Sequence, residues 1–296
     1  MLPTLSRLFI FAVLLFAMPQ RPATGLDFDR FSGFCTRLPA EQELLNDAAD
    51  GSLDDCSLLR ASLICAGHSE DNASRLENEF RASVTRCQRV VEAAAEGRAK
   101  EAIFGHLKDD FLYGAYRSEL CDAGRAIAQG EFNCLTATIL YQAFCHEFSI
   151  EVEALWEPSH VRCWVVLDGD GSGCVVEATA SSVAEAVGPR TTRQALADRL
   201  LTSSELLGKV LYNRGVTALL QEQFDVALSA TWASCLLDPL DQPAWNNLRA
   251  CLNNWALAAL ESDRRELAKS LLDAGIRLDP DYEPFRRNWA LLIGDR

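Results

Sequence analysis

The sequence lacks an excess of positive charge. Its 28 Lys and Arg residues are outnumbered by 42 Asp and Glu residues, which gives a formal net charge of −14. No stripe of basic residues interrupts this acidic balance. Nucleic acids and anionic membranes bind proteins through clustered basic side chains. The composition therefore argues against either as a partner and is typical of a solvated acidic surface.

Two further features are missing. The eleven cysteines include no Cys-x-x-Cys pair, so neither a cysteine zinc site nor a thioredoxin-type redox motif is indicated. We accordingly predict no metal and no cofactor. The apolar run at residues 8–18 has 11 residues, whereas a membrane-spanning helix needs roughly 20. This run is too short to cross a membrane.

The first 25 residues have the pattern of a signal peptide instead. Arg7 supplies the positive start, residues 8–18 the apolar stretch, and Ala23-Thr24-Gly25 a small-x-small cleavage site. An uncleaved anchor is the alternative. We expect an exported protein, periplasmic or secreted, that is cleaved near Gly25 and keeps no stable membrane span. Eleven cysteines fit such an oxidising compartment, although sequence alone does not fix their pairing.

The remaining chain is long enough for two domains. Residues 26–99 show helical periodicity without a chemical motif, and residues 100–187 change to a helix followed by strands. Residues 188–204 indicate a linker, and residues 205–296 return to a helical pattern. We predict an α+β protein in which the central helix packs on a small antiparallel sheet. A helical region precedes this core and an all-α domain follows it.

A candidate nucleophile stands at the start of the central helix. Asn133 is placed to cap the apolar helix that follows, which puts Cys134 in the first helical turn. Free backbone N–H groups and the positive end of the helix dipole stabilise a thiolate there. A buried structural cysteine or a disulfide partner is the competing interpretation of Cys134.

A histidine and a carboxylate follow on two predicted strands. The strands cover residues 160–167 and 174–179, and a glycine-rich turn signal at 168–173 separates them. Side chains alternate along a strand, so every even-length loop leaves His160 and Glu177 on one face of the hairpin. A carboxylate placed there accepts the imidazole N–H and stabilises the imidazolium. Such a pair is suited to activating a sulfur nucleophile.

Two registers of this hairpin are open. A turn at residues 168–169 makes the histidine and the glutamate direct partners and sets Cys163 opposite Cys174, which predicts a disulfide. A turn at residues 170–171 sets the glutamate opposite Trp164 and removes the cysteine pairing. The even-loop argument holds in both cases.

Three segments occur in the order cysteine, histidine, acid: Phe132-Asn133-Cys134, Ser159-His160-Val161 and Val176-Glu177-Ala178-Thr179. Together they resemble the transglutaminase-like core of the papain-like cysteine enzymes, over roughly residues 100–185. The resemblance implies acyl transfer, in which a thiolate attacks an amide or peptide carbonyl to form a thioester. Water or an amine then resolves the thioester.

The resemblance also implies a role for each side chain. Cys134 is the nucleophile, His160 the base and Glu177 the orienting acid. The family usually has Asp at the last position, so Glu177 is a departure, and the two aspartates of the turn at 168–173 are fallback acids. Gln129 is the candidate oxyanion donor beside the backbone N–H of the cysteine.

The C-terminal part resembles tetratricopeptide repeats. Cys235-Leu236-Leu237-Asp238-Pro239 is echoed by Ile276-Arg277-Leu278-Asp279-Pro280. The first repeat spans about 208–241, the second begins near Trp245, and residues 282–293 are predicted as a closing helix. Two repeats are few for an independent array, so we expect them to pack on the core. An unrelated helical bundle is the alternative.

Two functions are compatible with these patterns. The first is an exported cysteine-dependent acyl-transfer enzyme, acting on a protein or peptide by amide hydrolysis or transglutamination, with repeats that dock a protein partner. The second is a non-catalytic scaffold that retains the core fold and binds through its repeats. The shape of the cleft, which the sequence does not give, decides between hydrolysis and amine transfer.

Overall fold

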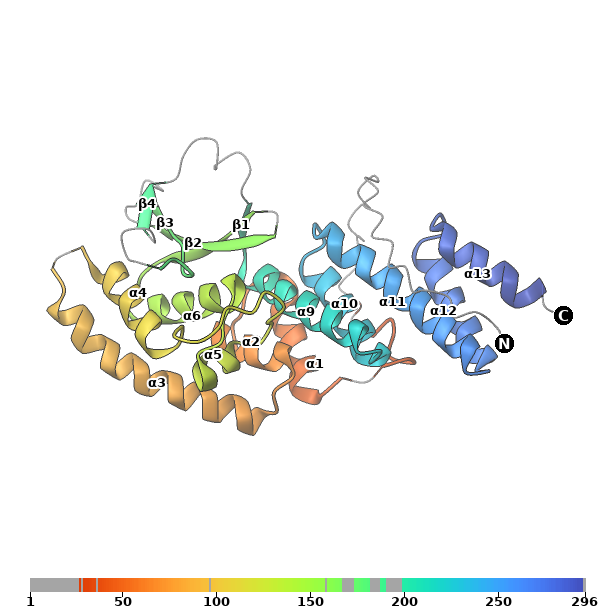
Figure 1. Ribbon diagram of the computed structural model, residues 1–296, viewed down its shortest axis with the longest axis horizontal. Helices are drawn as coiled ribbons and strands as arrows, with labels where there is room; N and C mark the ends of the chain where they lie inside the picture. The colour runs from red at the N-terminus through yellow and green to blue at the C-terminus, as the bar shows by residue number, and fades with distance from the viewer. Residues whose placement is uncertain are drawn as a thin grey trace.

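The structure, a computed structural model, describes residues 27, 29–35, 37–95, 97–157, 159–166, 173–181, 187–189 and 199–294. The predicted signal peptide, residues 1–25, lies outside these ranges. Within them, no helix is both long and apolar enough to cross a membrane. The chain begins with helices, continues through a small sheet and ends in a row of helices (Figure 1).

The N-terminal part is helical. Its elements are α1 (Pro39–Asp47), η1 (Ala48–Asp50), α2 (Leu58–Ala66), α3 (Glu70–Ala93), α4 (Ala99–Asp110) and α5 (Ala123–Gln129). Serine side chains fix two of the helix starts: Ser57 accepts a hydrogen bond from the Arg60 backbone, and Ser69 one from the Asn72 backbone. The helical prediction for this region is confirmed in its described part.

The central helix α6 (Cys134–Glu147) packs on an antiparallel sheet. The strands are β1 (Val152–Glu157), β2 (His160–Val166), β3 (Gly173–Val176), β4 (Val187–Pro189) and β5 (Arg199–Leu201), in the order β4-β3-β2-β1-β5. The sheet covers one side of α6, and α2, α4 and α5 pack on its other side (Figure 1). Every residue from Leu135 to Cys145 is therefore buried, and the predicted α+β class is confirmed.

The edges of the sheet come from a segment that the sequence indicates as a linker. Part of β4 and all of β5 fall within residues 188–204, and they pair with β3 and β1 respectively. Each of these strands has only three residues. A strand that short contains too few residues to show an alternating pattern, so its sequence resembles a loop.

The β2–β3 register differs from both predicted registers. Cys163 lies opposite Val176, and Cys174 lies opposite Val165. The disulfide predicted between the two cysteines is therefore wrong, because they are not direct partners. All eleven cysteines, which lie in the described residues, are free. The prediction of export depends on the pattern of the first 25 residues, which lie outside the described ranges.

The C-terminal part is all-α. It contains α9 (Ser203–Leu220), α10 (Phe224–Leu237), α11 (Gln242–Glu261), α12 (Arg265–Leu278) and α13 (Glu283–Gly294), arranged in a row of helical hairpins (Figure 1). A Cβ atom added at Gly215 would lie 2.5 Å from the Thr231 hydroxyl, so glycine permits the close approach of α9 and α10. The predicted closing helix is confirmed as α13.

The helical row packs mainly on the N-terminal helices, above all through α9 against α2, and meets the predicted core at strand β5. Ser204 at the start of α9 donates a hydrogen bond to the Ala48 carbonyl at 2.7 Å, and Arg214 pairs with Glu41 at 3.1 Å. A continuous cluster of buried apolar side chains extends from the N-terminal helices through α6 into the C-terminal helices. The two parts therefore share one core.

A buried ion cluster joins the sheet to the helical row. Lys209 on α9 contacts Asp241 at 2.7 Å and Asp238 at 2.8 Å, and its ammonium group lies 4.1 Å from the ring centre of Trp156 on β1. Both carboxylates and the ammonium group are at most 5% exposed. Each charge is therefore compensated where water has little access.

The segment before α1 packs on the helical row. The Trp232 indole donates a hydrogen bond to the Asp27 carbonyl at 2.8 Å, and the Phe31 ring meets it edge to face at 5.2 Å. Phe34 packs similarly against Trp255 at 6.2 Å. The first described residues are thus fixed to α10 and α11.

Candidate active site

The start of α6 is held by a buried capping box. The Asn133 side chain accepts a hydrogen bond from the Thr136 backbone at 3.0 Å, and the Thr136 hydroxyl accepts one from the Asn133 backbone at 3.0 Å. The Asn133 amide also donates to the Leu120 carbonyl at 2.6 Å. The predicted cap is confirmed. It makes the half-buried Cys134 the first residue of the helix.

Strand β2 brings His160 to the nucleophile. His160 is its first residue and follows Ser159, whose φ of 67° turns the chain out of β1. One turn after the nucleophile, the Thr138 hydroxyl donates to the Val161 carbonyl at 3.4 Å and ties α6 to β2. Val161 is buried while His160 remains partly exposed, as alternation along a strand requires.

The even-loop prediction is confirmed by a direct contact. His160 Nε2 lies 2.6 Å from Glu177 Oε2. The other carboxylate oxygen accepts hydrogen bonds from the backbone and the hydroxyl of Thr179, the backbone one at 3.1 Å. Because Nε2 is engaged by Glu177, Nδ1 is the ring nitrogen left for the sulfur of Cys134.

The surroundings favour a charged thiolate–imidazolium pair. Burial raises the pKa of the Cys134 thiol, but hydrogen bonds from His160 and from the Val161 backbone outweigh burial and leave the pKa lowered. The same contact with Cys134, and then the one with Glu177, raises the pKa of His160 to about 10. Burial raises the pKa of Glu177, yet its bonds from His160 and Thr179 lower the net value.

Cys134 differs in this respect from every other cysteine of the chain, all of which are described. Burial is the first cause of a raised pKa at each of the other ten: Cys35, Cys56, Cys65, Cys87, Cys121, Cys145, Cys163, Cys174, Cys235 and Cys251. Cys56 and Cys121 reach about 11, for example. A raised pKa makes a thiol inert at neutral pH, so the reactive thiol is expected at one position.

The candidate oxyanion donor Gln129 ends α5 with an exposed side chain, and its role stays a prediction. The structure adds a residue that the sequence did not indicate. The Tyr116 hydroxyl interacts with Cys134 and helps to lower the pKa of the thiol. Tyr116 is 18 positions before Cys134 and has no motif around it, so only the folded chain shows the contact.

No group of three or more His, Cys, Asp or Glu residues in the described chain is arranged to hold a metal ion.

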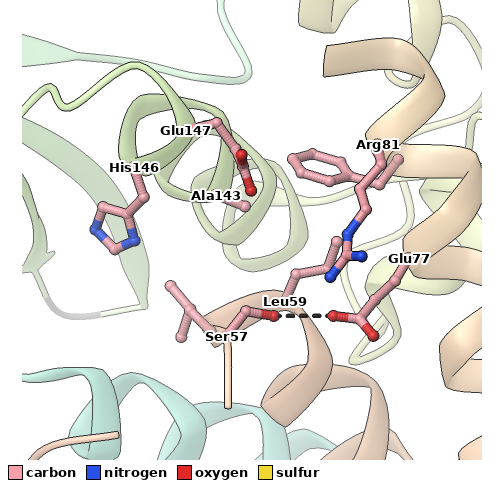
Figure 2. A pocket seen from close by; sticks show the side chains of 9 residues that line it. Ser57, Leu59, Glu77, Arg81, Ala143, His146 and Glu147 are labelled. Carbon is pink, nitrogen blue, oxygen red and sulfur yellow. Dashed lines mark hydrogen bonds between the residues drawn. The ribbon is translucent and has the colours of Figure 1, made fainter. Parts of the chain in front are cut away.

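A hollow lies between α2, α3 and the end of α6 (Figure 2). It is lined by Ser57, Leu58, Leu59, Glu77, Phe80, Arg81, Ala143, His146 and Glu147. Within it the Ser57 hydroxyl donates to Glu77 at 3.0 Å. Ala143 is nine residues after Cys134, about 13 Å along the helix, so the hollow is separate from the catalytic candidates.

Comparison with known proteins gives no family: no protein-family model matches the chain, and no curated protein matches it. The geometry around Cys134 therefore carries the functional conclusion.

Proposed function

We propose that the protein is an exported cysteine-dependent acyl-transfer enzyme with a transglutaminase-like core. One observation carries the proposal. Cys134 is the single thiol of eleven with a lowered pKa, and it contacts a histidine that Glu177 orients at 2.6 Å. A cysteine at a helix start followed by a histidine and an acid on adjacent strands is the constellation of that core, and here Glu177 directly follows β3.

The reaction follows from the charges. The Cys134 thiolate attacks the carbonyl carbon of a peptide or side-chain amide, and the electron pair of the C=O bond moves to oxygen. The backbone N–H of Cys134 stabilises that oxyanion. As the tetrahedral intermediate collapses, the C–N bond breaks and the His160 imidazolium gives its proton to the leaving amine. This leaves a thioester and a neutral imidazole.

The second half of the reaction resolves the thioester by the same steps in reverse order, with a new nucleophile. Neutral His160 takes a proton from water or from an amine, which attacks the thioester carbonyl. Collapse then breaks the C–S bond, restores the thiolate and leaves the imidazolium protonated. Glu177 keeps its charge throughout and stabilises the imidazolium. Water yields hydrolysis, and an amine yields transamidation.

The helical row supports a docking role within the same proposal. Its paired helices and closing helix match the arrangement expected of tetratricopeptide-type repeats. It is joined to the sheet through the contact of Lys209 with the Trp156 ring and to the N-terminal helices through Arg214. A protein bound on the row would thus be held in a fixed relation to Cys134, which suits delivery of a polypeptide substrate or partner.

Site-resolved alkylation tests the proposal. An ordinary thiol is only about 0.3% ionised at pH 6. Treated with iodoacetamide at that pH and analysed by peptide mass spectrometry, Cys134 should react at least about tenfold faster than a model thiol. Cys121, also half-buried but with a raised pKa of about 11, is the internal control.

The His160→Asn variant should return Cys134 to model-like labelling. Slow labelling of Cys134 in the wild-type protein would refute the enzyme and leave the scaffold function. Export is tested separately by N-terminal sequencing of the processed protein, which should begin close to Leu26. A protein that retains residues 1–25 would refute cleavage.

A further inference from the structure

The chain between α4 and α5 runs beside the segment that leads into the nucleophile. Tyr116 and Phe132 form a parallel bridge, in which the Arg117 N–H donates to the Phe132 carbonyl at 2.8 Å. The Phe132 N–H donates in return to the Ala115 carbonyl at 3.2 Å. Phe132 lies two residues before Cys134, so this backbone pairing fixes Tyr116 next to the first turn of α6.

The side chain of Tyr116 is directed to the nucleophile. Its ring meets the Phe132 ring edge to face, with centres 5.9 Å apart and an interplanar angle of 88°. Its hydroxyl interacts with the thiol and the backbone of Cys134. The hydroxyl therefore lies close to the sulfur and the N–H of the nucleophile.

The position beside the sulfur and the N–H of Cys134 is where a substrate carbonyl would bind during acyl transfer. The carbonyl carbon of a substrate must approach the sulfur while its oxygen accepts the bond from the nucleophile's own N–H. The Tyr116 hydroxyl lies beside that N–H. Tyr116 is 53% exposed, so a substrate carbonyl oxygen can reach its hydroxyl.

We propose that Tyr116 is a catalytic residue, the second donor of the oxyanion hole beside the Cys134 N–H. The inference rests on the proposed acyl-transfer function. Burial, and next the charge of the Cys134 thiolate, raise the pKa of Tyr116, so the phenol keeps its proton at neutral pH. As the carbonyl carbon becomes tetrahedral, the phenol O–H donates to the developing oxyanion without transferring its proton.

Two reagents distinguish an oxyanion donor from other roles. Iodoacetamide alkylates a thiolate by displacement at a saturated carbon, and no oxyanion forms. p-Nitrophenyl acetate acylates it through a tetrahedral oxyanion and releases p-nitrophenolate. Both rates are measured over a full pH range for the wild type, Tyr116→Phe and Cys134→Ser. Plateau rates are compared, so that a change in thiolate fraction cancels.

Tyr116→Phe keeps the ring against Phe132 and removes only the hydroxyl. We expect its acylation plateau to fall about 10²-fold, as for loss of one oxyanion donor, while its alkylation plateau changes by less than about threefold. Tyr113→Phe is the matched control. Tyr113 lies in the same segment, and its exposed ring lies over Gly130. Its variant should leave both rates unchanged.

Each other outcome overturns the inference. Two unchanged rates would mean that the hydroxyl is not used, and two raised rates that it merely covers the thiol. A parallel fall of both rates, with or without a lower melting temperature, would show a structural role. If wild-type acylation is absent or survives Cys134→Ser, the proposed function itself fails and the inference falls with it.

Discussion

The charge of Glu177 should contribute to the raised pKa of His160, and Glu177→Gln tests this without shortening the side chain. The Oε2···Nε2 contact of 2.6 Å is a charge-assisted hydrogen bond, of a kind worth about 1.5–3 kcal/mol. At 1.36 kcal/mol per pKa unit this corresponds to roughly one to two units. The two side chains are 33% and 25% exposed, and solvent screening favours the lower end. The pKa of His160 should fall from about 10 by roughly one unit.

Nuclear magnetic resonance can follow this titration because the chain has only four histidines. Imidazole spectra over pH 5–11 should show one histidine shifted in the variant and three unchanged. Glu147→Gln is the control. It removes an exposed carboxylate from the far end of α6 and should leave the pKa of His160 unchanged. A His160 titration that is the same in Glu177→Gln and wild type would refute the assigned pairing.

The raised pKa of His160 should also make the free energy of unfolding depend on pH. The pKa of His160 is raised in the folded protein from 6.5 to about 10, so its contribution is complete below about pH 6.5 and is lost as the pH rises to about 10. Urea unfolding should therefore show Glu177→Gln less stable than wild type at pH 6, and the difference should disappear above pH 10. A difference that grows with pH would contradict the assigned sign.

Three other substitutions test the supports of the site. Glu177→Asp should slow alkylation of the nucleophile at pH 6 about five- to tenfold, because the shorter acid loses a bond worth about 1 kcal/mol; equal or faster labelling would contradict this. Lys209→Met leaves the buried Asp241 without a cationic partner, while Asp238 keeps Arg199 at 2.6 Å, and should cost about 3 kcal/mol in urea unfolding. The exposed Lys269→Met is its control, and equal losses would refute the buried cluster. Gly130→Ala forces a side chain onto a φ of 75° and against a tyrosine ring at 2.6 Å, so it should lower stability by about 1–3 kcal/mol. Gly33→Ala, with no atom within 4 Å of the added carbon, should change the unfolding free energy little.

The features that the sequence predicted well depend on neighbours along the chain. Asn133 caps a helix through a bond to a residue three positions later, so its role is visible in the local sequence. Alternation along a strand likewise fixes the face of His160 and Glu177, whichever even-length turn forms. These statements need no knowledge of distant contacts, and the structure bears both of them out.

The features that the sequence missed depend on distant packing. The strongly turn-forming residues at 168–173 permit several loops, and the energy of the whole sheet selects one register among them. Tyr116 reaches Cys134 only because a loop between two helices pairs with the chain before α6. The number of cysteines gave no pairing, because composition says nothing about which thiols meet.

The register also accounts for the glutamate at a position where the resembling family has Asp. In the first of the two predicted registers His160 and Glu177 face each other directly, about 4.5–5.5 Å apart at Cβ, and a short acid would reach. In the observed register Cys163 pairs with Val176, the last residue of β3, and continuing that register by one residue would place Glu177 opposite Arg162. His160 is then a diagonal neighbour, about 7–8 Å away. The extra methylene of glutamate spans this distance while Thr179 holds the other oxygen.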